Sequence, residues 1–275
     1  MNILGIDFED WYHPELINPH VEKKEKNPII VKSLPNILDW LRKNETFATF
    51  FLVGELLKVQ PDLMDKIISE GHEIGFHTMT HKRLDIPGRK EEFEAEIKEF
   101  EVLTNGKSRG FRAPTFSLNE KSSWLIKILE ENNYLYDSSI VPVKTSMYGV
   151  PTAPKIPYKI SELSISRNNV KGKITEFPLL TTKFLGKKIP AGGGFYLRTL
   201  PLNSIKNAIK YMEKTNNPST FYIHSWELEP KNMPKIKMSK KDSFVTYHNL
   251  EKAKVKMTKI LKEFEFTSFE RFLKI

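Results

Sequence analysis

The chain has 275 residues and a mass of 32.0 kDa, which is enough for one large domain or two ordinary ones. Its composition, 39% hydrophobic, 11% aromatic and 28% charged, lies near globular averages and excludes a disordered or collagen-like polymer. The chain has no cysteine, so disulfides and thiolate ligands are excluded, and a metal site would have to use His, Asp or Glu.

The net charge of +9 is unevenly distributed along the chain. Residues 1–150 hold 19 Lys and Arg against 24 Asp and Glu, whereas residues 151–275 hold 24 against 10. A basic second half fits either an anionic partner, such as a phosphate-linked glycan or a membrane surface, or a solvated lysine-rich surface. We favour the solvated surface and expect no nucleic-acid partner.

The start of the chain bears on location. The segment MNILGIDFEDWYH places carboxylates where a signal peptide would have a basic flank and an apolar stretch. No run approaches the roughly 18 apolar residues of a membrane span. The sequence therefore predicts a cytoplasmic protein without a transmembrane segment, and leaves peripheral contact with a membrane open.

Short apolar runs alternate with amphipathic stretches along the chain. Runs rich in Ile, Phe, Val and Thr predict strands at 3–8, 48–53, 72–77 and 220–226. The stretches between and after them predict helices at 61–70, 91–103, 123–131, 201–214 and 249–264. This alternation predicts an α/β fold, either a barrel or an open sheet.

Three features interrupt this regular pattern. Prolines break the periodicity over 140–175, and 230–243 is also expected to be irregular. The run Gly192–Gly194 favours a bulge or loop, although it would also allow a ligand to approach the backbone closely. Because no linker or repeat separates these parts, we expect a single domain over 1–275.

A first cluster of chemically active residues follows the first predicted strand. Asp7, Glu9 and Asp10 stand in GIDFEDW, at the end of an apolar run. Ligands bind at such strand ends in α/β folds, and clustered carboxylates need a cation or shifted pKa values to be tolerated. A polar loop after a buried strand is the alternative interpretation.

A second cluster is the pair His77 and His81, directly after the predicted strand at 72–77. If this segment is helical, histidines four residues apart share a face and can reach one metal ion. Two histidines and a carboxylate would make three protein ligands, an arrangement typical of catalytic rather than structural zinc. Two solvent-facing histidines are the alternative.

Two further motifs contain ionisable residues in apolar surroundings. Arg112 in GFRAPTFS could orient a carboxylate by a bidentate pair, while Pro114 fixes the following backbone. A structural salt bridge is equally compatible with this segment. His224 in YIHSWE lies in a predicted strand, where a lone histidine is more often a satisfied core residue.

Taken in order, FED, HTMTH, RAPTF, YDSS and YIHSWE resemble the successive motifs of the polysaccharide deacetylases, which are metal-dependent carbohydrate esterases. The resemblance spans residues 3–228. The segments DFEDWYH, ATFFLVGE, AGGGFY and HSWE also resemble those of an exopolysaccharide-associated subgroup. That subgroup has a distinctive C-terminal part, which here corresponds to residues 229–275. The resemblance implies a distorted (β/α) barrel with fewer than eight strands and a divalent metal, usually zinc.

The resemblance also implies roles for the residues of the first two motifs. The metal ligands would be Asp10, His77 and His81. The family motif has two adjacent aspartates, of which the first is the base and the second a ligand. Here the aligned pair is Glu9 and Asp10, which departs from that motif. Asp7 lies on the same strand face as Glu9, so the base could be either residue, and we favour Glu9.

The later motifs would supply the remaining catalytic groups. Arg112 would brace the base, the backbone amide of Thr115 beside Pro114 would help to hold the oxyanion, and His224 would be the general acid. Thr115 replaces the usual Tyr, which leaves the amide but removes a ring. Asp137 is present in YDSSI, but the Trp that usually follows it is absent.

Aromatic residues beside these motifs are candidates for sugar stacking, although each could equally be a core residue: Trp11, Phe116, Tyr196 and Trp226. His13 and Glu227 receive no role.

The implied activity is removal of N-acetyl groups from amino sugars of a polysaccharide or glycan precursor. A hydrolase of another linear or cyclic amide, or a non-catalytic glycan- or polyanion-binding scaffold, are the alternatives.

Overall fold

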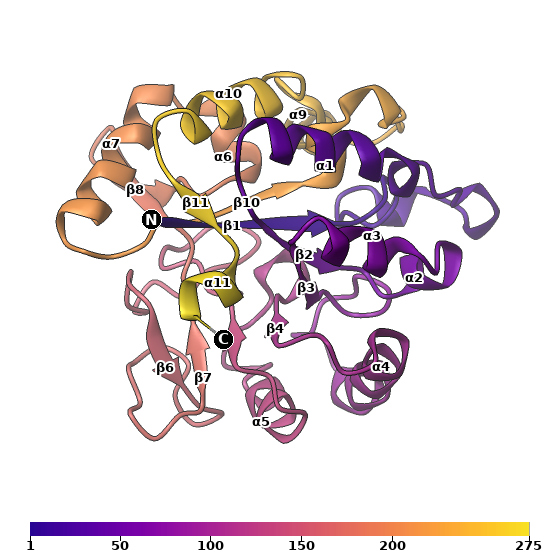
Figure 1. Cartoon of the computed structure of the whole chain (residues 1–275), viewed down its shortest axis with the longest axis horizontal. Coiled ribbons are helices and arrows are strands. Elements are labelled where there is room, and N and C mark those ends of the chain that lie inside the picture. Colours follow the sequence, from indigo (N-terminus) through magenta and orange to yellow (C-terminus); the bar gives the residue numbers. More distant parts are fainter. Residues whose placement is uncertain (275) are drawn as a thin grey trace.

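The strand β1 (Asn2–Phe8) is an interior strand of the sheet, between β10 and β2, and all seven of its residues are buried. A strand that is buried along its whole length is typical of a parallel sheet covered on both faces. In the computed structural model, which describes residues 1–274, the sheet curls strongly and helices lie along its outside (Figure 1). Within these residues, no helix is both long and apolar enough to span a lipid bilayer.

The sheet has the strand order β10-β1-β2-β3-β4-β5-β7-β6, and β11 adds to the start of β1. From β10 to β7 all neighbours are parallel, and β6 is antiparallel to β7. The other strands are β2 (Thr49–Leu52), β3 (Glu73–Phe76), β4 (Gly110–Phe111), β5 (Tyr136–Asp137), β6 (Tyr158–Ile160), β7 (Ile174–Glu176), β10 (Thr220–His224) and β11 (Phe266–Thr267). The strands β8 (Thr181–Phe184) and β9 (Lys187–Pro190) form a separate hairpin.

Single bridges connect the chain after β7 to β10. Leu179 forms a parallel bridge with Thr220, and Gly193 with Tyr222. A Cβ atom on Gly193 would lie 1.9 Å from the Tyr222 carbonyl oxygen, and the residue has φ 140°, so the backbone path requires glycine. This loop around Gly193 therefore packs against the sheet. The seven consecutive parallel strands found within residues 1–274 confirm the predicted distorted α/β barrel.

The helices are α1 (Leu34–Lys43), α2 (Glu55–Val59), α3 (Leu63–Ser69), α4 (Arg89–Thr104), α5 (Trp124–Glu131), α6 (Gly194–Thr199), α7 (Leu202–Lys214), α8 (Ser225–Leu228), α9 (Lys240–Tyr247), α10 (Lys252–Leu261) and α11 (Phe269–Leu273). The predicted helices correspond to α3, α4, α5, α7 and α10. In α4, Phe93 and Phe100 pack on Phe76 of β3, with ring centroids 6.0 and 4.3 Å apart. Apolar residues at helical spacing thus bury α4 against the sheet.

Three expectations about local structure were wrong. The strand expected at 220–226 ends at His224, because Ser225 begins the short helix α8. The segment 230–243 is not wholly irregular, since the Ser239 hydroxyl accepts the backbone N–H of Asp242 and caps the start of α9. His77 and His81 lie in a loop, not a helix.

The amino ends of the strands are covered by the C-terminal helix α11, which lies near the start of β1 (Figure 1). Phe269 of α11 is fully buried and stacks on Tyr136 at 4.7 Å. Ile3, Phe51 and Phe177 complete this cluster. The amino end of the barrel is therefore filled by side chains.

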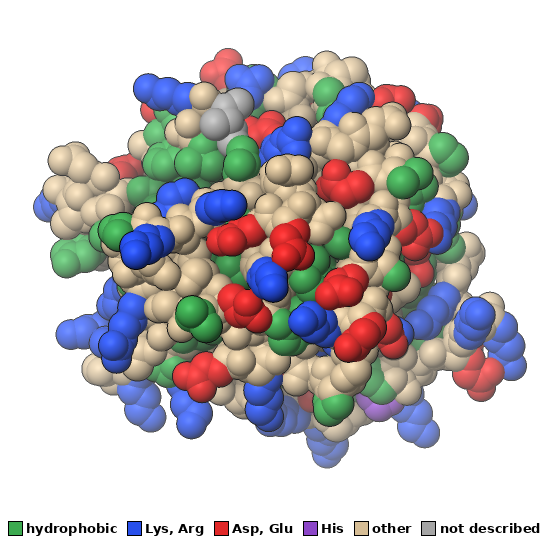
Figure 2. Space-filling view, turned by 90° about the horizontal axis from the view of Figure 1, so that it is seen from below, with side chains coloured by type: hydrophobic (Ala, Val, Ile, Leu, Met, Phe, Trp, Pro, Cys, Tyr) green, Lys and Arg blue, Asp and Glu red, His purple; other side chains and the backbone are tan. Residues whose placement is uncertain are grey.

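Charged side chains of both signs are mixed on the face shown in Figure 2. Lys and Arg alternate there with Asp and Glu, and no uniform basic patch covers this face. On this face the arrangement resembles an ordinary solvated surface rather than a polyanion-binding one.

Candidate active site

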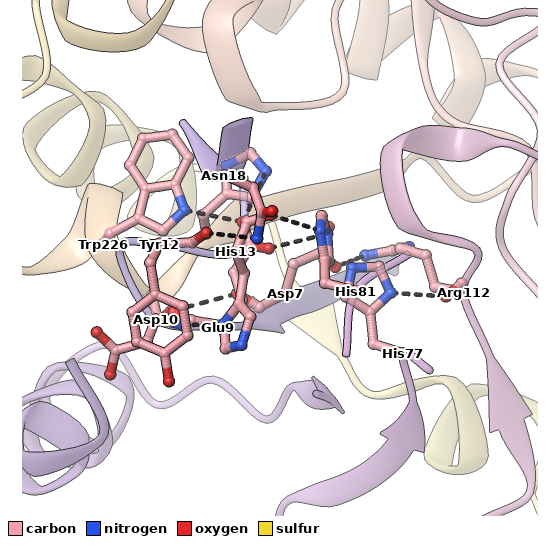
Figure 3. Close-up of polar contacts among 12 residues, drawn as sticks. Asp7, Glu9, Asp10, Tyr12, His13, Asn18, His77, His81, Arg112 and Trp226 are labelled. Carbon is pink, nitrogen blue, oxygen red and sulfur yellow. Dashed lines mark hydrogen bonds and ion pairs between the residues drawn. The ribbon is translucent and has the colours of Figure 1, made fainter. Parts of the chain in front are cut away.

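Three ligand atoms converge beyond the carboxyl ends of β1 and β3. Glu9 directly follows β1, while His77 and His81 follow β3, and all three are buried. One ligand atom of each lies within 4.8 Å of the others. The Glu9 Oε2 and His81 Nε2 atoms are 2.8 Å apart (Figure 3). Parallel strands bring these residues together because their carboxyl ends meet at one edge of the sheet.

Both histidines are oriented by backbone carbonyl groups. His77 Nδ1 lies 2.6 Å from the Arg112 oxygen, and His81 Nδ1 lies 3.0 Å from the His13 oxygen. Because a carbonyl only accepts, each Nδ1 carries a hydrogen, and each Nε2 is the nitrogen that faces the cluster. Burial opposes protonation of His81, but the Glu9 carboxylate beside its Nε2 raises the pKa of this ring. Burial lowers the pKa of His77 to about 4, so this ring is neutral at neutral pH.

The loop that carries the histidines is bent at both ends of the motif. Thr78 and His81 have φ values of 61° and 58°, in the left-handed region. The first amides of α2 fix it, since the Gly54 N–H donates to the Thr78 oxygen and the Glu55 N–H to the Met79 oxygen, both at 3.0 Å. This bend, and not helical spacing, brings the ring nitrogens of His77 and His81 close enough to bind one ion.

The cluster fits a divalent cation. Glu9 Oε2 is buried and accepts no hydrogen bond within residues 1–274, which is costly for a carboxylate oxygen unless a cation faces it. Burial alone would raise the pKa of Glu9, but the positive charge of protonated His81 and its contact with Oε2 hold that pKa well below its usual value, with smaller contributions from His224 and His77. Two imidazole nitrogens and one carboxylate oxygen form a donor set typical of zinc-class metals.

Asp10 does not join this cluster, which revises the sequence-based assignment. Its Oδ1 accepts the backbone N–H groups of Trp11 and Ile29, at 2.9 and 3.1 Å, and its Oδ2 accepts that of Val31 at 3.2 Å. The carboxylate thereby fastens the segment before α1 to the end of β1. Glu9, expected to be the base, occupies the position expected for Asp10.

Asp7 is paired with Arg112, the residue that was expected to brace the general base. Arg112 NH1 donates to Asp7 Oδ1 at 2.6 Å (Figure 3). Its Nε donates to the Ser138 carbonyl oxygen and its NH2 to the Ser138 hydroxyl, both at 2.9 Å. Arg112 is completely buried. A Cβ on Gly5 would lie 2.6 Å from Arg112 NH1, so the glycine leaves room for the guanidinium inside the barrel.

His224 faces the same site from β10. Its Nδ1 is 2.7 Å from Glu227 Oε2, and its Nε2 is 3.9 Å from Glu9 Oε1. Burial opposes protonation, but the Glu227 carboxylate raises the pKa of His224. Trp226 stacks on the His224 ring at 4.4 Å and donates from Nε1 to Glu9 Oε1 at 2.9 Å.

A cavity of about 140 Å³ opens over these groups. The predicted site residues that line it are Asp7, Glu9, His77, His81, Thr115, Phe116, His224 and Trp226. Thr115 and Phe116 belong to the 3₁₀ turn η4 (Pro114–Phe116), and both have positive φ. Apolar side chains make up much of the remaining wall.

Six other predicted residues are not part of the cavity wall: Asp10, Trp11, Arg112, Pro114, Asp137 and Tyr196. The Trp11 indole donates to the Asn27 oxygen at 2.9 Å, and Tyr196 packs against the main core. Pro114 is buried at the start of η4. Arg112 lies beneath the cavity and reaches it through Asp7.

Asp137 belongs to a separate buried network. Its Oδ1 accepts the Ser139 hydroxyl at 2.5 Å, and neighbouring Glu176 accepts the Ile140 N–H at 3.0 Å. Burial raises the pKa of both carboxyl groups, and Asp137 raises that of Glu176 further. This geometry gives Asp137 no contact with the cavity.

Sequence reasoning missed several residues of the site. Glu227 could have been found from its position three residues after His224, a spacing at which side chains meet in a helical turn. Arg198, by contrast, carries no such signal. The rest of the wall comes from β10, from the loop after β1 and from later loops and helices: Tyr222, Pro14, Glu15, Leu16, Met147, Tyr148, Phe195, Val245 and Thr246.

Comparison with known families matches nearly all of the chain to two models. Residues 25–134 match the polysaccharide deacetylase family, and residues 138–274 match a domain of unknown function, DUF3473. The matched segment, residues 25–134, belongs to the polysaccharide deacetylase family. The strands β2 and β10 come from different matched regions and both pair with β1, so the two regions share one sheet.

Curated relatives match short segments of this chain. A chitooligosaccharide deacetylase of Sinorhizobium fredii is 38% identical over 65 residues, 24% of this chain and 29% of the relative. A peptidoglycan-N-acetylglucosamine deacetylase of Bacillus cereus is 47% identical over 47 residues, 17% and 22% of the two chains. The chain thus aligns with less than a third of the length of each of these relatives.

The fold agrees with a crystal structure from Mycobacterium smegmatis that is assigned to the polysaccharide deacetylases. The superposition has a TM-score of 0.59 and covers 99% of this chain and 89% of the other, at 15% sequence identity. At this identity the similarity supports the barrel fold alone.

Proposed function

We propose that this protein is a metal-dependent hydrolase that removes N-acetyl groups from amino sugars of a polysaccharide or a glycan precursor. The observation that carries the proposal is one cavity surrounded by the Glu9, His77 and His81 cluster, the Asp7–Arg112 pair and His224. Two matched relatives support this substrate class, because one is named a chitooligosaccharide deacetylase and the other a peptidoglycan-N-acetylglucosamine deacetylase.

Glu9, His77 and His81 would hold the metal. A bound divalent cation of the zinc class supplies Lewis acidity, which polarises the amide carbonyl and activates water. The carbonyl bonds at both Nδ1 atoms keep the imidazoles in the tautomer that a ligand needs. Trp226 restrains the Glu9 carboxylate through its indole N–H.

Asp7 is then the general base, because it lines the cavity and Arg112 holds its carboxylate in place. It takes a proton from the attacking water. The backbone N–H of Thr115 stabilises the oxyanion that develops on the amide oxygen. His224 donates a proton from Nε2 to the leaving nitrogen, since its Nδ1 is held by Glu227. The products are acetate and the free amine.

This assignment accounts for the departure from the usual motif of adjacent aspartates. Residues two apart in an extended strand point to the same side, so Asp7 and Glu9 both face the barrel interior while Asp10 faces away. Glu9 has one more methylene than Asp, and it can reach the histidines from a position just past the strand.

The test combines metal content with product release. Purified protein is analysed by elemental mass spectrometry and assayed for acetate release from N-acetylglucosamine oligomers. We expect about one zinc-class ion per chain, lost in Glu9→Ala and kept in Asp10→Ala. Asp10→Ala is the matched control, because it removes the adjacent carboxylate.

Two outcomes would contradict the proposal. Metal retained by Glu9→Ala and lost from Asp10→Ala would return the ligand role to Asp10. A metal-loaded wild-type protein that releases no acetate from acetylated amino sugars, but cleaves another linear or cyclic amide, would change the substrate class.

A further inference from the structure

Arg198 is a buried arginine on α6, within the region matched to a domain of unknown function. It is 2% exposed. NH1 donates to the carbonyl oxygens of Thr246 and His248, at 3.0 and 2.8 Å, and NH2 donates to that of Val245 at 2.8 Å. Its Nε forms an ion pair with Glu227 Oε1 at 2.7 Å. Every nitrogen of this guanidinium therefore faces an oxygen.

The three carbonyl groups lie at the carboxyl end of α9, next to α6 in Figure 1. The last carbonyls of a helix have no partner within the helix and carry partial negative charge. A guanidinium with several fixed donors satisfies them together. Arg198 thus attaches the end of α9 to the body of the protein. Val245 and Thr246 at this end form part of the cavity wall.

The fourth contact of Arg198 leads to the proton donor. Glu227 is fully buried and its two carboxylate oxygens have different partners. Oε1 faces Arg198, and Oε2 faces His224 Nδ1 at 2.7 Å. The contact between Arg198 Nε and Glu227 Oε1 is not aligned as a hydrogen bond, but the attraction between the two buried charges restrains the carboxylate. Oε2 is thereby kept beside the imidazole. The ring of His224 is in this way tied to α9 through two side chains.

We propose that Arg198 is a positioning residue that aligns His224 through Glu227 and secures the C-terminal segment to the cavity. On this view the region of unknown function completes the active site. It supplies the proton donor His224, the residues Glu227 and Arg198 that position it, and part of the cavity wall. The kinetic part of this inference rests on the proposed deacetylase function, whereas its structural part does not.

Direct binding of substrate is the competing role, since Arg198 also lines the cavity. A residue that binds an anionic sugar equally in ground and transition states changes KM and leaves kcat unchanged. A positioning residue that acts through the proton donor lowers kcat. Two residues that act as one unit also give strongly non-additive losses in a double-mutant cycle.

The experiment uses the full-length, metal-loaded protein as Arg198→Met, Glu227→Gln and the double variant. We expect each single variant to lower kcat by about 10- to 100-fold, less than the roughly 10²–10⁴-fold cost of losing a general acid. The double variant should be no slower than the slower single variant. Arg89→Met is the matched control, because Arg89 is also 2% exposed and paired with glutamates but lies outside the cavity wall.

A second readout needs no substrate. The proton on His224 Nδ1, shared with Glu227, should give a downfield NMR resonance that is identified by its loss in His224→Gln. We expect this resonance to disappear or move upfield in Arg198→Met and to persist in Arg89→Met. If Arg198→Met does not fold, Arg198→Lys, which keeps the charge but cannot reach all four oxygens, replaces it in both measurements.

Losses that multiply in the double variant, a change in KM alone, or an unchanged His224 resonance would each overturn the inference. A wild-type protein that releases no acetate would refute the proposed function instead. In that case the NMR comparison alone decides whether Arg198 positions His224.

Discussion

The two ends of the barrel differ in their residue types and in what those residues do. At the carboxyl ends of the strands, Asp7, Glu9 and His224 surround an open cavity. At the amino ends, Phe269 and Tyr136 fill the barrel beneath α11. In parallel α/β barrels the carboxyl end carries function and the amino end contributes stability, and this division is also visible here.

The pKa values of buried carboxyl groups also differ between the two ends of the barrel. Glu227 at the carboxyl end is completely buried, which would raise its pKa, yet His224 and Arg198 hold that pKa below its usual value. Glu73 at the amino end is also buried, but its contacts are the neutral donors Thr49 and Tyr136 and the backbone N–H of Glu270. Burial raises the pKa of Glu73 to about 8, with a contribution from the Glu270 charge. Cationic partners, not burial, decide which carboxylates stay charged.

The largest effect should come from the carboxyl end. We expect Asp7→Asn to lower the rate of acetate release by about 10²–10⁴-fold, because the general base is lost. Metal content should stay near that of the wild type, since Asp7 is outside the ligand cluster. The assay is product release beside elemental mass spectrometry. Near-normal turnover would return the role of base to Glu9.

At the amino end, removal of a packed ring should affect stability alone. We expect Phe269→Ala to lower the free energy of unfolding by about 3–5 kcal/mol, the usual cost of deleting a buried aromatic ring. Urea titration measures this change. Metal content at low urea should be unchanged. A folded variant that had lost its metal would break the distinction between the two ends.

The protonation of Glu73 predicts how stability depends on pH. The unfolded chain releases this proton near pH 4.5, whereas the folded chain keeps it up to about pH 8. Rising pH between these values therefore favours the unfolded state, and we expect a loss of about 1 kcal/mol per pH unit. Glu73→Gln should remove this slope. Urea titrations of both proteins at pH 5, 6.5 and 8 test it, and equal slopes would mean that Glu73 is ionised in the fold.

The smallest effect concerns one hydrogen bond at the carboxyl end. Trp226→Phe keeps a ring that can stack on His224 but removes the N–H that restrains Glu9. We expect metal affinity to fall by about 10- to 100-fold, which is usual for a residue that supports a ligand. Trp11→Phe is the control, because its N–H bonds the Asn27 carbonyl instead. Competition with a chelator measures the metal affinity of both variants. Equal losses of affinity would mean that the Trp226 N–H has no specific role in holding Glu9.

Much of the site could be predicted because its parts carry local signals. The spacing of His77 and His81 indicated a shared metal, and the loop bend achieves what a helix was expected to achieve. The position expected for Asp10 is occupied by Glu9, because alignment to adjacent aspartates outweighed the alternation of a strand in the assignment from sequence. That alternation places Asp7 and Glu9 on one side and Asp10 on the other.

By itself the sequence determined the residue types of the site, the alternation of strands and helices, and the order of the motifs, since each depends on neighbours along the chain. Only the tertiary structure decided which carboxylate meets the histidines and which distant segments close the cavity. Arg198 illustrates the reason, because its four partners lie between about 30 and 50 residues away along the chain. Such contacts depend on the path of the backbone through the whole barrel, which no local pattern encodes.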